Sequence, residues 1–299
     1  MASTKEIKDR ISSVRDTLKI TNAMYLISST KMRKARRDAE QVRPYFSLLR
    51  REIRRMFAVS ADARNRYFDP NVDDNVKGGR NAILVITGDK GLAGSYNQNV
   101  IREALAKADM SDAYEMYVVG DYGWRYFRNH GTNVELSFEH SMNVPSLAMA
   151  RDITEELLED FDKREFDRIY VCYTEFSGGL GAGNTRCDRI LPFDKDDFVP
   201  KGEETASDAS TVFEFEPDVE TVLESSLISY MGGYIYSALV NSYSSEQNAR
   251  MMAMDAANDN ASELLARLEL EYNHLRQNAI TQEITEVSSG ARSLRKKKR

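Results

Sequence analysis

Apolar side chains recur at helical spacing along residues 218–289, a stretch that contains no proline. The pattern predicts one helix of about 70 residues, roughly 105 Å long at about 1.5 Å per residue. Part of this helix carries a seam that alternates steps of three and four, with Asn258 as its one polar position: Met251, Met254, Ala261, Leu265, Leu268, Tyr272, Leu275 and Ala279. Such a seam is typical of a coiled coil.

The N-terminal part of the chain has a matching seam and no proline before Pro44. Its positions also step by four and three: Ile7, Ile11, Val14, Leu18, Thr21, Tyr25, Ser28, Met32, Ala35, Ala39 and Val42. Two long helices from opposite termini are therefore expected to pair as an antiparallel coiled coil. The alternative is that each helix packs separately into globular layers.

Between the helices, short apolar runs alternate with amphipathic stretches, which is typical of a three-layer α/β domain. We expect strands at 81–87, 115–120, 168–174, 186–193 and 211–215, with helices at 97–108, 121–130 and 145–163. Four segments follow: an N-terminal coiled-coil helix at 1–66, a Rossmann-like α/β domain at 75–215, a C-terminal coiled-coil helix at 218–290 and a basic tail at 291–299.

The composition, with 41% apolar and 29% charged residues, indicates a foldable, soluble chain. No signal or transit segment is recognisable at the N-terminus. Residues 225–245 carry no charge but include serines at 225, 226, 229, 237 and 242, so we expect a helix buried on several sides rather than a membrane span. Cys172 and Cys187 are too few for a disulfide framework or a zinc site, and we expect small core residues, with a regulatory pair as the less favoured alternative.

Charge is unevenly distributed along the chain. Residues 1–66 hold 17 basic and seven acidic side chains, a net charge of +10, whereas residues 67–217 have a net charge of -14. The basic side chains cluster on the N-terminal helix, at Lys31, Arg33, Lys34, Arg36 and Arg37 and again at Arg50, Arg51, Arg54 and Arg55. This face could be solvated, bind phosphate or receive acidic loops of a partner protein, and charge alone does not decide.

Two glycine-rich loops do not meet the requirements of nucleotide binding. In the first, residues 88–95, Gly94 stands where a P-loop needs lysine before serine, and the glycines lie three apart, so the dinucleotide fingerprint is missing. The second loop, 178–185, lies between two expected strands. We expect no cofactor. Asp89 and Lys90 could form an active-site pair, but a salt bridge within the loop is favoured.

Catalytic and metal-binding patterns are absent from the sequence. His130, His140 and His274 are scattered, none at metal-ligand spacing to another imidazole or thiol, and no Gly-x-Ser-x-Gly elbow occurs. We therefore expect neither a catalytic site nor a metal.

Three blocks of sequence resemble the gamma subunit of bacterial F-type ATP synthase, and they occur in that family's order. The first includes Lys19-Ile20-Thr21-Asn22-Ala23-Met24, and the second is Gly88-Asp89-Lys90-Gly91-Leu92-Ala93-Gly94-Ser95. The third and most specific is Ser245-Glu246-Gln247-Asn248-Ala249-Arg250-Met251, followed by Arg276-Gln277-Asn278-Ala279-Ile280-Thr281-Gln282-Glu283. The resemblance spans essentially the whole chain.

The resemblance implies a non-catalytic central shaft that rotates inside a ring of alpha and beta subunits and couples ion flow to ATP synthesis or hydrolysis on beta. Its foot would contact the epsilon subunit and the membrane rotor ring at the cytoplasmic face of the plasma membrane, without direct membrane insertion. No nucleic-acid partner is implied. The chain would transmit torque without binding ATP, in agreement with the missing nucleotide motifs.

By residue, the family's beta-facing contacts map onto Met24, Arg250, Arg276, Gln277, Thr281 and Glu283, and we include Lys31 and Arg33 of the basic cluster as partner contacts. For Met24 a seam position is an equal alternative. Two departures from the family are visible: Ala93 and Ser95 stand where cysteine and glycine are common, and the basic ending at 294–299 runs past the usual stop. We favour a disordered, solvated tail over one that reaches the far mouth of the ring.

Two other functions compete with this reading. A basic coiled-coil scaffold or nucleic-acid-binding protein would account for the +10 N-terminal segment and predicts salt-sensitive DNA or RNA binding. A Rossmann-like enzyme with helical extensions would need the cofactor fingerprint that the glycine spacing denies.

Overall fold

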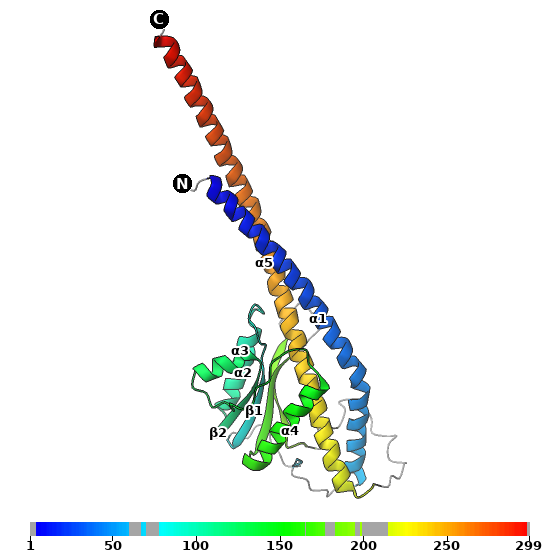
Figure 1. Ribbon diagram of the computed structural model, residues 1–299. Coiled ribbons are helices and arrows are strands. Elements are labelled where there is room, and N and C mark those ends of the chain that lie inside the picture. Colours follow the sequence, from blue (N-terminus) through cyan, green and yellow to red (C-terminus); the bar gives the residue numbers. More distant parts are fainter. Residues whose placement is uncertain are drawn as a thin grey trace. The chain divides into compact units, whose positions relative to one another are not determined.

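Two long helices, three shorter helices and a four-stranded sheet make up the described part of the computed structural model (Figure 1). It describes residues 4–59, 67–69, 78–164, 166–176, 183–194, 198 and 215–297, and for 58, 59, 164 and 291–297 the description is limited to the backbone. Helix α1 covers Thr4–Val59 and helix α5 covers Val219–Lys297. The chain divides into two compact units, one of Met1–Ile27 with Met251–Arg299 and one of Ser28–Arg250.

The first unit is a pair of antiparallel helix segments. Contacts run in opposite order along the two segments, since Ile7 and Ile11 pack with Leu268, whereas Thr21 and Asn22 bond to Asn258. An ion pair of 2.5 Å between Arg15 Nη2 and Glu269 Oε1 also joins the two segments. The predicted pairing of the terminal helices is thus confirmed.

Both predicted seams coincide with the covered faces of their helices. All eleven N-terminal seam positions are buried or partly buried, and so are those of the C-terminal seam from Met251 to Leu275. Ala279, the last predicted position, is exposed. Every described side chain from 276 to 290 is exposed as well, so α5 has no covered face there within the described chain. Coiled-coil supercoiling itself stays a prediction.

Helix α1 is described to Val59, within its predicted bounds of 1–66, whereas helix α5 runs past its predicted end at 290. Helix α1 continues through Pro44, although proline cannot donate the helical hydrogen bond, and the Ser47 hydroxyl donates to the Pro44 carbonyl oxygen at 2.8 Å. Helix α5 runs to Lys297, so the backbone of the ending 294–299, which we expected to be disordered, is helical as far as 297, and 298–299 lie outside the described residues.

The second unit holds the sheet, in the order β2-β1-β3-β4. Strands β1 (Arg80–Ile86), β2 (Ala113–Val119) and β3 (Arg168–Glu175) are parallel, and β4 (Asn184–Leu191) is antiparallel to β3. Helices α2 (Tyr96–Ala108), α3 (Asp121–Asn129) and α4 (Leu147–Arg164) connect the parallel strands. These elements confirm the predicted strands and helices except 211–215, of which 211–214 lie outside the described residues.

Apolar side chains on the two faces of the sheet pack into two separate cores. Ile83 and Val85 face α2 and α3, whereas Leu84 and Ile86 face α4, the first half of α5 and the end of α1. Figure 1 shows α2 and α3 on one side of the sheet and α4 on the other. The uncharged stretch 225–245 of α5 contributes largely to the second core, as expected for a helix buried on several sides.

Helices α1 and α5 approach closely within this unit at a glycine. A Cβ on Gly233 would overlap the Phe46 ring, so only glycine leaves room for that ring. No helix in the described part of the chain has an apolar stretch long enough to cross a bilayer.

The two cysteines form a disulfide, which corrects the expectation of two separate core thiols. Cys172 on β3 lies opposite Cys187 on β4 in the antiparallel register, with the two Cα atoms 4.0 Å apart. Adjacent strands bring directly opposed side chains within bonding reach.

Candidate functional site: the junction of the sheet with α5

A run of polar side chains on α5 is buried where this helix passes the carboxyl ends of β1 and β3. Residues that are less than a tenth exposed include Ser242, Ser244, Ser245, Glu246, Gln247 and Asn248. Buried polar groups of this density need hydrogen-bond partners, since an unpaired one is costly. Ser242 and Ser245 bond to the end of β3, and Glu246 pairs with Arg250, which bonds to the glycine loop 88–95. We call this set of contacts the sheet–helix junction.

The glycine loop begins where β1 ends and is held open by side-chain hydrogen bonds. Asn97, in the first turn of α2, accepts from the Gly88 N–H at 2.9 Å and donates to the Lys90 carbonyl oxygen at 3.4 Å. Gly88 must be small, since a Cβ there would lie 2.7 Å from Glu246 Oε1. The loop backbone therefore rests directly on the carboxylate of α5.

Arg250 ties this loop to α5. Its Nη2 donates to the carbonyl oxygen of Gly91 at 3.1 Å and of Lys90 at 3.4 Å, and it pairs with Glu246 Oε1 at 2.5 Å. The side chains of Arg250 and Glu246 are only 11% and 5% exposed. A buried pair of this kind is costly to break, because the remaining charge would stay buried without its partner.

Burial disfavours the ionised form of Glu246 and raises the pKa of its carboxyl, with the Asp89 carboxylate acting in the same direction. Arg250 and Lys31 oppose this effect. The pKa of the neighbouring Tyr96 hydroxyl is also raised, first by burial and then by the charge of Glu246. Tyr96 thus stays neutral and donates to the Ile86 carbonyl oxygen at 3.3 Å.

Asp89 anchors the other side of the glycine loop. Its carboxylate accepts from the Met142 N–H at 2.7 Å, the Ser141 hydroxyl at 2.9 Å and the Asp121 N–H at 3.3 Å. The expected salt bridge between Asp89 and Lys90 is therefore wrong: the carboxylate is used by backbone and hydroxyl donors instead. Asp89 consequently holds the loop rather than forming an active-site pair.

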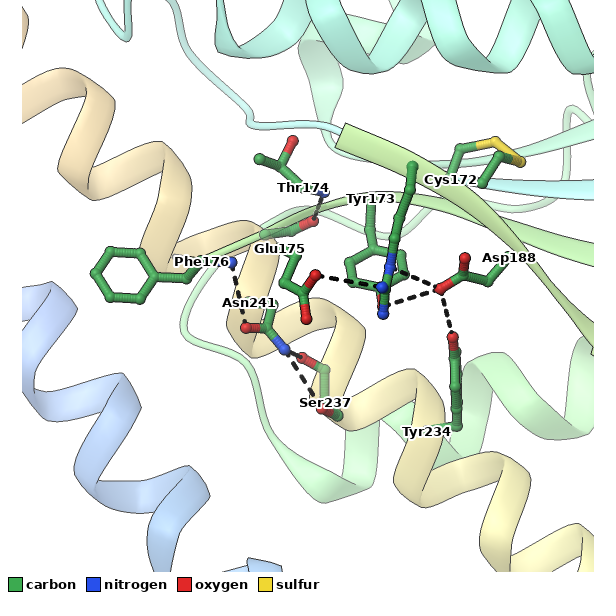
Figure 2. A network of polar contacts seen from close by, with 12 residues as sticks. Cys172, Tyr173, Thr174, Glu175, Phe176, Asp188, Tyr234, Ser237 and Asn241 are labelled. Carbon is green, nitrogen blue, oxygen red and sulfur yellow. Dashed lines mark hydrogen bonds and ion pairs between the residues drawn. A yellow bond between two sulfur atoms is a disulfide. The ribbon is translucent and has the colours of Figure 1, made fainter. Parts of the chain in front are cut away.

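The end of β3 makes a second set of contacts with α5 (Figure 2). Ser242 Oγ accepts from the Thr174 N–H at 3.3 Å, and the Ser245 hydroxyl donates to the Thr174 carbonyl oxygen at 3.2 Å. Asn241 Oδ1 accepts from the Phe176 N–H at 3.4 Å. Backbone groups at the end of the strand are thereby satisfied by helix side chains.

A network of ionic and phenolic groups joins β3, β4 and α5 next to these bonds (Figure 2). Asp188 Oδ2 accepts from the hydroxyls of Tyr173 at 3.1 Å and Tyr234 at 2.9 Å and pairs with Arg186 Nε at 2.8 Å. Arg186 also reaches Glu175 at 3.2 Å. Burial is the main cause of the raised pKa of both tyrosines, so each remains a neutral donor.

Contacts on both faces of β4 therefore hold this strand in place. On one face Asp188 links the strand to α5, and on the other the disulfide Cys172–Cys187 joins it to β3 beside the core that α2 forms. The arrangement holds the sheet and the helix in one geometry. No group of three or more metal-ligating side chains lies together in the described residues.

The partner contacts expected from the sequence fall into two groups. Arg250 lies inside the junction, whereas Arg276, Gln277, Thr281 and Glu283 are exposed on the far part of α5. Lys31 and Arg33 are exposed on α1, and Met24 is partly buried. Thr281 also donates to the Gln277 carbonyl oxygen at 2.9 Å within its helix.

Sequence reasoning missed the other members of the junction, above all Glu246, Asn97 and Ser242. The sequence contains only a weak indication that these residues are buried. A run of polar residues directly continuing an uncharged helical stretch is ambiguous between a solvated and a buried face. Contacts distant in sequence decide it, across 68 residues for Ser242 with Thr174 and 159 residues for Arg250 with Gly91.

Architecture and junction together define a class of protein: two terminal helices paired with each other and fixed to an inserted α/β domain. A family model described as ATP synthase matches residues 3–294. The ATP synthase gamma chain of Acetivibrio thermocellus is 38% identical over 300 residues, covering 99% of this chain and 100% of the relative. The sodium ion specific gamma chain of Acetobacterium woodii is 34% identical over 97% of this chain and 98% of its own length. The chain belongs to the ATP synthase gamma-chain family.

Solved structures agree with this fold. The central stalk of Tetrahymena thermophila mitochondrial ATP synthase aligns with a TM-score of 0.55 at 22% identity, over 80% of this chain and 99% of that one. A Euglena gracilis mitochondrial ATP synthase chain aligns with a TM-score of 0.52 at 17% identity, over 93% and 97% of the two chains. The mixed α/β fold with long terminal helices is thus the fold of a central-stalk subunit.

Proposed function

We propose that this chain is the rotating central stalk that couples ion flow through a membrane rotor to ATP synthesis or hydrolysis on surrounding catalytic subunits. The observation that carries the proposal is the end of α5. There Ile280, Ile284 and Val287 are 48%, 64% and 73% exposed and recur at steps of four and three, so they form one apolar stripe. An exposed apolar stripe on a helix indicates a protein surface that covers it.

The stripe suits a bearing inside a ring of alpha and beta subunits. Apolar contacts are non-directional, so a helix with such a surface can turn against its surroundings without breaking specific bonds. Polar side chains on the same stretch, Arg276, Gln277, Thr281 and Glu283, would supply contacts that differ among beta conformations. Rotation drives catalysis only through such differences, because equal contact with every conformation would favour none.

The sheet–helix junction has the complementary role of holding the α/β domain rigidly on α5. Torque that enters through that domain must reach the helix without slippage, and a network of buried hydrogen bonds and ion pairs resists sliding because every displaced group would be left unsatisfied. In this proposal Arg250 acts by fixing the glycine loop, and Met24, Lys31 and Arg33 face the partner subunits directly.

The proposed partners are the alpha and beta subunits around the helices, and the epsilon subunit and the membrane rotor ring at the α/β domain. The chain itself is non-catalytic. The complex would lie at the cytoplasmic face of the plasma membrane, with this chain attached peripherally.

Reconstitution tests the proposal. Alpha and beta subunits are combined with the wild-type chain, with a variant carrying Ile280→Ser, Ile284→Ser and Val287→Ser, or with a control carrying Met110→Ser and Leu136→Ser, two exposed positions of the α/β unit. We expect ATPase turnover to depend on the chain, to fall several-fold with the stripe variant and to be unchanged with the control. A chain that never joins these subunits, or turnover that is indifferent to it, would refute the proposal.

A further inference from the structure

A cavity of about 820 Å³ lies between α1 and α5 within the second unit, away from the sheet–helix junction's glycine loop. This volume falls within the range of small-ligand sites. One wall is basic, since five arginines of α1 line it: Arg36, Arg43, Arg50, Arg51 and Arg54. Among the lining residues that the structure describes, Glu40 is the one acid.

The facing wall consists of uncharged α5 side chains. Hydroxyl and amide groups come from Tyr230, Tyr234, Tyr236, Ser237, Asn241 and Ser244. The Ser244 hydroxyl is the informative member, because the residue is 1% exposed and its oxygen has no hydrogen-bond partner within the described structure. A buried hydroxyl without a partner is costly, and a ligand oxygen in the cavity would satisfy it.

One arginine of the basic wall is held in place by an aromatic ring. The Arg36 guanidinium lies 4.7 Å from the centre of the Phe176 ring, and Phe176 also lines the cavity. Stacking on an aromatic face orders a guanidinium while its N–H groups stay available at the edge, where they match the oxygens of phosphate. Arg43 follows two turns later on the same helix face, about 10 Å along the axis at ~1.5 Å per residue.

We propose that this cavity binds a ligand carrying at least two phosphoryl groups, with Arg36 and Arg43 as its charged contacts and Ser244 as a hydroxyl donor. A ligand with adjacent phosphates can offer a separate phosphate to each of these arginines, which lie two helical turns apart on α1. Arginine forks bind phosphate oxygens in pairs, and such charge-assisted bonds are stronger than neutral ones. The ligand could be a free polyphosphate or a lipid headgroup with two phosphates. The proposal does not depend on the rotary role.

The test uses the full chain in about 150 mM salt, where charges further apart than roughly 8 Å are screened. Inorganic tripolyphosphate is titrated calorimetrically, and co-sedimentation is measured with phosphatidylcholine vesicles with and without cardiolipin. The variants are Arg36→Gln/Arg43→Gln, Ser244→Ala and the control Lys34→Gln/Arg37→Gln, which removes two charges from α1 outside the cavity lining. Circular dichroism confirms that each variant folds.

We expect saturable binding of at least one probe, weakened tenfold or more by Arg36→Gln/Arg43→Gln, a few-fold by Ser244→Ala and less than twofold by the control. Tripolyphosphate binding alone identifies a free polyphosphate, and cardiolipin-dependent sedimentation alone identifies a lipid headgroup. Failure of both probes to bind, or an equal loss in the control, overturns the proposal, because an equal loss means that only the general charge of α1 is involved.

Discussion

Replacing Arg250 by methionine is the sharpest test of the sheet–helix junction. Methionine keeps an unbranched apolar stem but removes the guanidinium, so the hydrogen bonds to the carbonyl oxygens of Lys90 and Gly91 are lost. The change also leaves Glu246, whose side chain is 5% exposed, without its ion-pair partner at 2.5 Å.

The expected loss of unfolding free energy at neutral pH is about 3 kcal/mol, the lower end of the cost of removing one partner from a buried ion pair. It stays at the lower end because Glu246 can take up a proton. Burial already raises the pKa of this carboxyl in the wild-type protein, and removal of Arg250 raises that pKa further.

The pH dependence has a definite sign. A carboxyl whose pKa is raised by folding binds its proton more tightly in the folded state, so its contribution to stability is fully present below the unfolded pKa and falls as pH rises through the folded pKa. The Arg250→Met variant should therefore lose stability more steeply than wild type above about pH 4.5. Glu246→Gln should remove this fall, because glutamine has no proton to lose.

Urea unfolding of the full chain, followed by circular dichroism between pH 5 and pH 8, measures both effects. A double-mutant cycle with Arg250→Met and Glu246→Gln should give a coupling energy above about 1 kcal/mol. The control is Arg267→Met, which breaks a pair with Glu263 at the same spacing on α5 but with side chains 72% and 64% exposed, and it should cost less than about 0.5 kcal/mol. An Arg250→Met cost no larger than the Arg267→Met cost, or an unchanged pH slope, would show that the junction is not held by this pair.

Three further predictions concern other contacts. Gly88→Ala should lower the unfolding free energy by about 1–3 kcal/mol, because its Cβ would meet the Glu246 carboxylate, whereas Gly91→Ala, where nothing lies within 4 Å, should have little effect in the same urea assay. Reduction of the Cys172–Cys187 disulfide, which closes a separation of 15 residues, should cost about 3 kcal/mol in thermal or urea unfolding, and a Cys172→Ser/Cys187→Ser variant should not respond to reductant. Leu268→Ala, at a side chain 5% exposed in the helix pair, should cost about 2–5 kcal/mol, against less than about 0.5 kcal/mol for Leu270→Ala at 63% exposure; similar losses at both positions would contradict the predicted seam.

The long-range helix pairing was predictable because the signal is local and repeated. Each seam position faces the same side of its own helix, and the three-four spacing therefore shows up in the sequence without knowledge of the partner. Burial agrees with it at positions as far apart as Ile7 and Ala35 on α1. The exception, Ala279, fails for a physical reason: its helix continues beyond the described part of α1 that could cover it.

The junction was not predictable, since its members are close only in the folded chain. Arg250 and Gly91 are 159 residues apart, and neither residue type indicates a buried contact by itself. The disulfide could not be predicted from the sequence for the same reason. Cys172 and Cys187 are recognisable as a pair only once the antiparallel register places them opposite each other, and composition favoured two separate thiols.

A polar junction has one property that an apolar one of equal stability would lack. Replacing a buried ion pair by well-packed apolar side chains often leaves stability unchanged, so Glu246 and Arg250 are not needed for stability as such. Apolar surfaces, however, can slide to neighbouring registers at small cost, whereas Arg250 makes its bonds to Gly91 and Lys90 in one position only. For a helix that must transmit torque, one fixed position relative to the glycine loop matters more than additional stability. The exposed stripe at Ile280 and Ile284 has the opposite chemistry, and α5 thus combines a fixed end with an end suited to turning.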